Sequence, residues 1–288
     1  MSNLLFSSSL VSIDWLKENL HHQNLVILDA SVPPIIPFTS FVIPADLKDR
    51  HIPHALRFDY DNQICDKQSS LPHMMPDAEI FVEEVRKLGI NNDSAVLIYD
   101  NVGVYASPRA WWMFKSMGHD NVAVLDGGSV EWFRAGLAMS NNLLTTSEVI
   151  GNFIACNREN YFCNAMMVYR LLNDPFCTIV DARSEGRFYG REPEPRENLR
   201  GGHMPGSKNL PFQQVLNDTR MKSLEELTTL FAGVVEPEQY LVSTCGSGLS
   251  ACILTLAAVL AGFEKLSVYD GSWCEWGQTG KLPVVLNE

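Results

Sequence analysis

Short apolar runs recur along the chain and alternate with segments that have a helical pattern. The runs lie at residues 25–30, 95–100, 122–125, 177–181, 241–244 and 266–269. Runs of this length, bounded by turn residues, are typical of strands that are buried on both faces. The helical pattern is clear at 77–88, before Gly89, and at 107–113, where we expect Ser107 to cap the helix. The alternation predicts an α/β fold in which each sheet is mostly parallel.

The second half of the chain repeats the first. An aspartate ends an apolar run in each half, Asp29 and Asp181, and equivalent turns follow in the same order at nearly constant spacing. Each copy has the size of an ordinary domain. We therefore expect one domain at residues 1–145 and a second at 158–288, with a linker at 146–157.

Cys245 stands in a short loop between a predicted strand and a predicted helix at 249–260. Gly246 and Gly248, on either side of Ser247, let backbone N–H groups turn inward around one point. The helix start adds the positive end of its dipole. This setting favours a thiolate, so the loop predicts that Cys245 is a nucleophile and not one more buried cysteine.

The first copy has Asp100 at the position of Cys245. A carboxylate cannot act as a thiolate nucleophile. We therefore expect one active site in each chain, in the second copy.

Charge and cysteine usage narrow the possible functions. With 22 basic and 34 acidic residues, the net charge is −12, and no basic cluster occurs, so neither nucleic acid nor a membrane surface is expected as a partner. No stretch approaches the ~20 apolar residues of a membrane span, and the first ten residues lack a signal pattern. Seven cysteines without a Cys-x-x-Cys pair make a disulfide framework or a metal site unexpected. We expect a cytoplasmic protein without a metal or other cofactor.

Taken together, these elements resemble the two-domain rhodanese superfamily. The catalytic loop is most similar to Cys-Gly-Ser-Gly-Val-Thr-Ala, the loop of the 3-mercaptopyruvate sulfurtransferases within that superfamily. This chain has Leu249 for the valine and Ser250 for the threonine, and both replacements are close in size and character. Further matches lie at residues 71–76, 187–188 and 192–196. The resemblance covers nearly the whole chain.

The resemblance implies both the fold and the reaction. It implies two tandem rhodanese-like domains, each a mostly parallel sheet flanked by helices, of which only the second is catalytic. It also implies that Cys245 takes sulfur from the small molecule 3-mercaptopyruvate, releases pyruvate and becomes a persulfide. A thiol such as that of reduced thioredoxin, or cyanide, then accepts the sulfur in ping-pong covalent catalysis.

The resemblance also implies the site residues. Two arginines would hold the substrate, since a guanidinium fork suits a carboxylate beside a ketone. The implied substrate-binding residues are Arg187, Arg196, Gly246, Gly248, Leu249 and Ser250. Ser247 would relay a proton, with Asp61 and His73 from the first half close to it. The residues alone fit a loop cap at His73 and a solvated Asp61 equally well.

Four other functions compete with this interpretation. A redox protein that pairs Cys245 with Cys252 is the weakest, because a span of roughly 10 Å by helical rise is too long for a disulfide. A cysteine phosphatase needs an arginine that closes the loop, and Ala251 occupies that position. A thiosulfate:cyanide sulfurtransferase is the nearest alternative, although related enzymes of that type have charged residues where this chain has Gly246 and Ser247. The fourth is a non-enzymatic sulfur carrier or binding module, which the complete loop and both arginines disfavour.

Overall fold

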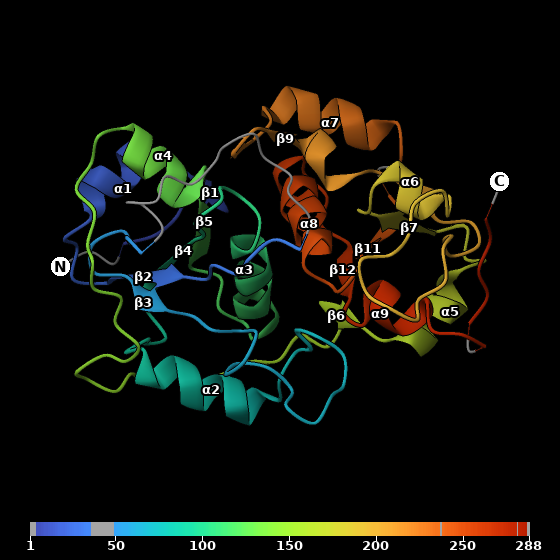
Figure 1. The fold of residues 1–288 in the computed structure, drawn as a ribbon. Coiled ribbons are helices and arrows are strands. Elements are labelled where there is room, and N and C mark those ends of the chain that lie inside the picture. Colours follow the sequence, from blue (N-terminus) through green and yellow to red (C-terminus); the bar gives the residue numbers. More distant parts are fainter. Residues whose placement is uncertain (1–3, 36–48, 237, 281, 287–288) are drawn as a thin grey trace. The chain divides into compact units, whose positions relative to one another are not determined.

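The computed structural model describes residues 4–35, 49–236, 238–280 and 282–286. The chain forms two compact units (Figure 1). The first unit comprises residues 1–67, 76–158 and 216–221, as far as they are described. The second comprises the described parts of residues 68–75, 159–215 and 222–288.

The first unit contains a parallel sheet of five strands in the order β1-β5-β4-β2-β3. Its strands are β1 (Leu10–Val11), β2 (Leu25–Asp29), β3 (Leu56–Arg57), β4 (Ala95–Tyr99) and β5 (Val122–Leu125). Every residue of β4 is buried, as expected for a central strand covered on both faces. The register pairs Leu25 with Ala95 and Asp29 with Tyr99, so β2 and β4 end at the same edge.

The described part of the first unit has four helices, which lie between or after these strands along the chain. They are α1 (Ile13–Asn19), α2 (Ala78–Lys87), α3 (Ser107–Ser116) and α4 (Gly128–Arg134). The Ser12 hydroxyl caps α1 by accepting the Trp15 N–H at 3.1 Å. Gly89 follows α2 with a φ of 74°, a left-handed conformation that suits glycine.

The second unit repeats the same sheet, with the order β6-β12-β11-β7-β8 and only parallel pairs. Its strands are β6 (Phe162–Cys163), β7 (Cys177–Asp181), β8 (Lys208–Asn209), β11 (Tyr240–Thr244) and β12 (Leu266–Tyr269). β7 and β11 correspond to β2 and β4, and their register likewise pairs Thr244 with Asp181 at one edge. The predicted fold class, a duplicated α/β domain with parallel sheets, is confirmed.

The helices of the second unit include the one that follows the cysteine loop. They are α5 (Ala165–Leu171), α6 (Glu185–Phe188), α7 (Leu224–Ala232), α8 (Ser250–Leu260) and α9 (Ser272–Trp276), with a 3-10 helix at Phe212–Val215. α8 is apolar on all sides and mostly buried, because it contacts α7, β11 and β12. No helix in the described parts of the chain is long and apolar enough to cross a membrane.

Each unit also takes up a short segment from the other half of the chain. In the second unit, the N–H of Met75 donates to Oδ2 of Asp270 at 2.8 Å. In the first unit, the hairpin of β9 (Leu216–Asn217) and β10 (Arg220–Met221) is bound in the same way, since the Met221 N–H donates to Oδ1 of Asp126 at 2.9 Å. Asp126 and Asp270 are the equivalent aspartates of the two Asp-Gly turns, so the repeat extends to this contact.

Candidate active site

Cys245 lies directly after β11, at the edge of the sheet where parallel α/β folds bind their ligands. The loop from Cys245 to Leu249 leads into α8. Gly248 has a φ of 77°, so only a glycine adopts this turn without strain. The Cys245 side chain is buried. The predicted strand, loop and helix are therefore present around the predicted nucleophile.

Ser272, the first residue of α9, holds the backbone of the nucleophile. Its hydroxyl accepts the Cys245 N–H at 3.2 Å and donates to the Tyr269 carbonyl at 2.8 Å. Ser272 itself has a φ of 47°, in the left-handed region that few residues other than glycine occupy. No local pattern predicts that Ser272 contacts Cys245, because the two residues are far apart in the chain.

The next two residues of α9 fix the direction of the loop peptides. The Trp273 N–H donates to the Cys245 carbonyl at 2.9 Å, and the Cys274 N–H donates to the Gly246 carbonyl at 2.8 Å. In a trans peptide the C=O and the following N–H point in opposite directions. The N–H groups of Gly246 and Ser247 therefore face away from α9, which is the arrangement that an inward-facing anion nest requires.

The equivalent loop of the first unit shows what such a nest binds. Backbone N–H groups of Tyr105, Ala106 and Ser107 each donate to Oδ2 of Asp100 at 2.9 Å, and the Val102 N–H donates to Oδ1 at 3.1 Å. Burial raises the pKa of Asp100, while these hydrogen bonds act in the opposite direction. The loop thus encloses a carboxyl group of its own chain.

The prediction that Ser107 caps α3 is wrong. Ser107 is the first residue of α3 and Ala106 precedes it as the cap residue, without a side-chain cap. The Ser107 hydroxyl donates to Oδ2 of Asp100 at 2.7 Å. The start of α3 is buried, and Asp100 accepts the N–H groups of Ala106 and Ser107 there, so the carboxylate caps the helix and the Ser107 hydroxyl serves the carboxylate.

Arg187 reaches the catalytic loop from α6. The Ser184 hydroxyl caps this short helix by accepting the Arg187 N–H at 3.4 Å. Nη2 of Arg187 lies only 3.1 Å from the point where a Cβ atom on Gly246 would stand. The small size of Gly246 therefore makes room for the guanidinium directly beside Cys245.

A buried carboxylate, Glu194, fixes the orientation of Arg187. Glu194 accepts hydrogen bonds from Nε and Nη2 of Arg187 and from Nη1 of Arg183, the last at 2.8 Å. Arg183 in turn binds Asp181 through Nη2 at 2.7 Å and lies over the Trp273 ring at 3.9 Å. Charges of opposite sign thus alternate from the end of β7 to the catalytic loop. Sequence reasoning missed the role of Glu194, although its place between two arginines was a usable signal.

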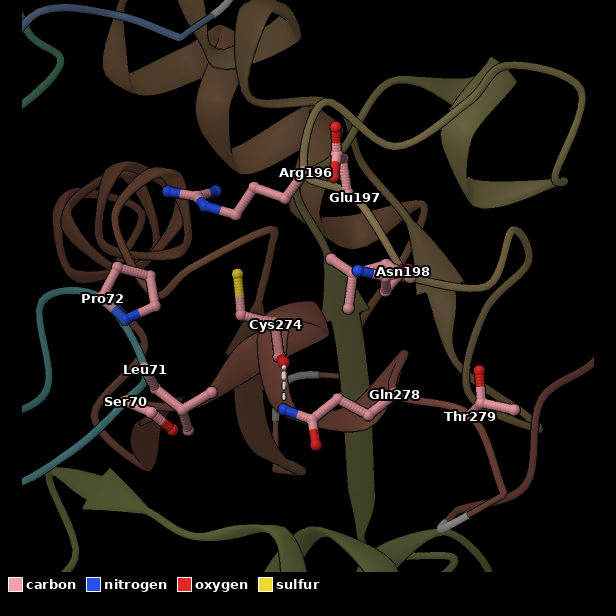
Figure 2. A pocket seen from close by; sticks show the side chains of 10 residues that line it. Ser70, Leu71, Pro72, Arg196, Glu197, Asn198, Cys274, Gln278 and Thr279 are labelled. Atoms are coloured by element: carbon pink, nitrogen blue, oxygen red, sulfur yellow. Dashed lines mark hydrogen bonds between the residues drawn. The ribbon is translucent and has the colours of Figure 1, made fainter.

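A cavity of about 470 Å³ adjoins this cluster (Figure 2). It is lined by Ser70, Leu71, Pro72, Arg196, Glu197, Asn198, Leu199, Cys274, Gln278 and Thr279. In Figure 2 the Cys274 sulfur points to the side on which Arg196 lies. All the lining residues belong to the second unit, including the three contributed by the 68–75 segment.

Burial and the charged groups of the site shift the pKa of the Cys274 thiol. Burial raises the pKa of this thiol to about 11, the guanidinium groups of Arg196 and Arg187 act in the opposite direction, and Cys245 and Glu194 raise it further. The geometry agrees, because Arg196 lines the same cavity as Cys274, and the Gly246 carbonyl that accepts the Cys274 N–H belongs to the residue beside which Arg187 lies. The structure therefore brings the predicted nucleophile and both predicted substrate arginines together around Cys274.

The remaining predicted loop residues follow Cys245 directly. Ser247 and Leu249 are buried, and Ser250 is the first residue of α8. Together with Gly246 and Gly248 they form the loop. Their roles toward a substrate stay predictions.

His73 and Asp61 lie in different units. His73 belongs to the 68–75 segment of the second unit and is buried, with a left-handed φ of 59°. Asp61 is an exposed residue of the first unit, and its N–H donates to Oδ1 of Asp59 at 3.2 Å. The structure thus places His73 in the unit that contains Cys245, while a role for Asp61 at the site stays a prediction.

Comparisons with known proteins agree with this architecture. The model of the rhodanese-like domain matches residues 12–135 and 165–279. Human 3-mercaptopyruvate sulfurtransferase is 38% identical over 288 residues, which cover 97% of this chain and 95% of the human protein. The Arabidopsis thaliana thiosulfate/3-mercaptopyruvate sulfurtransferase 1, named as mitochondrial, is 35% identical over 304 residues, covering 98% of this chain and 79% of the relative.

A solved structure shares the whole architecture. The 3-mercaptopyruvate sulfotransferase SseA from Escherichia coli superposes with a TM-score of 0.80 at 30% sequence identity, covering 93% of this chain and 99% of SseA. The predicted family is confirmed by the two domain matches, by the relatives that span nearly the whole chain and by this shared fold. The chain belongs to the rhodanese family and contains two rhodanese-like domains.

Proposed function

We propose that this chain is a 3-mercaptopyruvate sulfurtransferase that carries sulfur as a persulfide on Cys245. The observation that supports this substrate most directly is the position of Arg187, whose Nη2 lies 3.1 Å from the Cβ position of Gly246. A cation fixed beside the nucleophile can bind a carboxylate that enters with the sulfur. The predicted enzyme class agrees with the names of relatives that match the chain over nearly its full length.

The reaction transfers one sulfur atom in two steps. The Cys245 thiolate attacks the sulfur of 3-mercaptopyruvate, an S–S bond forms, and the C–S bond breaks. The leaving carbon takes the bonding electrons, so pyruvate departs as its enolate and is then protonated. The N–H groups of Gly246 and Ser247 are oriented to stabilise the negative charge of the persulfide. An acceptor thiol removes the outer sulfur in the second step.

The arginines have distinct roles in this proposal. Glu194 engages the Nε–Nη2 edge of Arg187, so the substrate carboxylate meets the opposite edge. Arg196 lines the cavity and binds the other end of the keto acid. Ser247 relays the proton, assisted by His73 and Asp61 as the family resemblance implies.

Thiosulfate is the second candidate donor. The name of the Arabidopsis relative includes both thiosulfate and 3-mercaptopyruvate, and both arginines would attract a dianion. The neutral pair Gly246 and Ser247 favours the organic substrate, because Gly246 leaves room for the Arg187 guanidinium and neither residue adds a further cation. Thiosulfate turnover is therefore expected as a weaker activity of the same cysteine.

The acceptor and the compartment are further parts of the proposal. We propose a thiol acceptor such as reduced thioredoxin, and a reducing, cytoplasmic environment. All seven cysteines are free thiols in the structure, which fits such an environment. Because the name of one relative includes a mitochondrial location, fractionation of cells that express the chain decides this point.

A comparison of two donors tests the proposed function. Purified protein is supplied with 3-mercaptopyruvate or thiosulfate and a thiol acceptor, and kcat/KM is measured for each donor from the product formed. We expect a clear preference for 3-mercaptopyruvate and loss of both activities in Cys245→Ser, whereas Cys163→Ser, a buried cysteine at the end of β6, keeps both. A preference for thiosulfate would support the second candidate. Absence of turnover with either donor would support the binding-module alternative.

A further inference from the structure

A second thiol, Cys274, lies beside the proposed sulfur-carrying residue. We propose that Cys274 resolves the Cys245 persulfide: its sulfur attacks the inner sulfur of the persulfide, closes a Cys245–Cys274 disulfide and releases hydrogen sulfide. The chain would thereby release sulfide once without an external thiol. This inference rests on the proposed function, which supplies the persulfide.

The backbone contacts place the two cysteines within reach of each other. α9 pairs with the catalytic loop through adjacent hydrogen bonds, from Trp273 to Cys245 at 2.9 Å and from Cys274 to Gly246 at 2.8 Å. Each of these bonds joins a residue at or next to one cysteine to a residue at or next to the other, so the two cysteine backbones are adjacent. A disulfide spans Cα atoms that are about 4.4–6.8 Å apart. The thiols are also close enough for Cys245 to raise the pKa of Cys274.

The surroundings of Cys274 suit the proposed chemistry. Its side chain is buried, and it lines the cavity of about 470 Å³ together with Arg196 (Figure 2). The guanidinium groups of Arg196 and Arg187 favour the thiolate that must form and can stabilise the departing hydrosulfide. Burial keeps most of the thiol protonated, so resolution is slow and an acceptor that enters the cavity can take the sulfur first.

The step balances without a further reactant. The Cys274 thiolate forms a bond to Sγ of Cys245, and the bond between that sulfur and the outer sulfur breaks. The outer sulfur leaves as HS⁻ with the bonding electrons and is reduced, while the Cys274 sulfur is oxidised. The proton lost by Cys274 completes hydrogen sulfide. A dithiol of the acceptor class reopens the disulfide by exchange.

Cys252 is the competing thiol, and its position argues against it. It lies on α8, and its Sγ donates to the Gly248 carbonyl at 3.3 Å. Its thiol is thus bound to the backbone at the start of its own helix, and Cys252 is not among the residues that line the cavity. Cys274 is therefore the better placed of the two, although Cys252 is nearer in sequence.

The test uses the full chain loaded with 3-mercaptopyruvate and then freed from excess donor, with no acceptor present. Intact mass and released sulfide are followed over time. We expect the wild-type mass to rise by one sulfur atom and then fall to two hydrogens below the reduced protein, while one sulfide per chain is released. Cleavage by trypsin after Lys222, Lys265 and Lys281 separates Cys245 from Cys274, so the disulfide joins two peptides. A bond from Cys245 to Cys252 would stay within one peptide.

Cys274→Ala and the matched control Cys252→Ala decide the outcome. Cys274→Ala should gain the sulfur, keep it and lose the release of sulfide, whereas Cys252→Ala should behave as the wild type does. A stable persulfide in the wild type, sulfide release from Cys274→Ala at the wild-type rate, or a persulfide on Cys274 would overturn the inference. If no variant gains sulfur from 3-mercaptopyruvate, the proposed function fails instead, and loading Cys245 with inorganic polysulfide tests the resolving step separately.

Discussion

Adding a single methyl group at Gly246 tests the spatial basis of the proposed substrate site. In Gly246→Ala, the new Cβ would lie 3.1 Å from Nη2 of Arg187, closer than ordinary van der Waals contact. The Gly246 backbone is not in the left-handed region, so alanine is tolerated there without strain. The substitution therefore acts on Arg187 and leaves the loop conformation available.

The guanidinium cannot move away without losing existing bonds. Nε and Nη2 of Arg187 are bound to Glu194, and Glu194 is itself held by Arg183. A shift of a few tenths of an ångström misaligns the edge that is proposed to bind the substrate carboxylate. A charge-assisted hydrogen bond is worth about 1.5–3 kcal/mol. Losing one such bond corresponds to a decrease of roughly ten- to a hundredfold in kcat/KM.

The assay measures kcat/KM of Gly246→Ala with 3-mercaptopyruvate and with thiosulfate, beside unfolding in urea. We expect the larger decrease with 3-mercaptopyruvate, because only the keto acid uses the fork geometry, and an unchanged free energy of unfolding. Gly233→Ala is the control, since its φ of −78° suits alanine and its Cβ would make only an ordinary contact, 3.5 Å from the Leu230 carbonyl oxygen. An unchanged kcat/KM for both donors, or equal losses for both, would refute the reasoning.

Two further predictions concern ion pairs. Glu194→Gln leaves Arg187 without its buried counter-charge and leaves Arg183 with Asp181 alone, so the free energy of unfolding should fall by about 3 kcal/mol or more. The exposed Glu185→Gln should change it by less than about 1 kcal/mol, and equal urea midpoints for the two variants would contradict this. Arg158 holds the pKa of Asp120 well below its usual value, with help from Lys115. This pair is exposed, so it stabilises the fold by about 1 kcal/mol or less. The stabilisation is fully present above the ordinary pKa of a carboxyl group, and it is lost as pH falls through the lowered pKa of Asp120 in the folded protein. The difference in urea midpoint between wild type and Asp120→Asn should therefore become smaller as pH falls. A difference that stays constant from pH 7 to pH 3 would show that the ion pair does not stabilise the fold.

The fold and the nucleophile could be predicted from the sequence because local patterns determine them. Continuous apolar runs identified β2, β4, β7 and β11, and the repeat fixed their equivalence. The two glycines beside Cys245 marked the catalytic turn. Each of these signals lies within a few residues of the structure that it specifies.

What the sequence did not reveal depends on contacts between distant residues. The 68–75 segment joins the second unit through a hydrogen bond from Met75 to Asp270, and 195 residues separate the pair. No periodic pattern encodes such a contact. Glu194 and Cys274 were missed for the same reason, since their importance comes from the arginines and the loop that packing brings to them.

The two loops together explain why one copy of the domain can carry sulfur and the other cannot. In the first unit, four backbone N–H groups and one hydroxyl are directed at the carboxyl group of Asp100, which fills the loop permanently. A group that occupies the nest in this way cannot leave it, so no reaction intermediate can take its place. In the second unit the position belongs to Cys245, whose neutral thiol acquires charge only as a thiolate or a persulfide. The same arrangement of amide groups can therefore stabilise the fold in one copy, and in the other it remains available for the charge that develops during sulfur transfer.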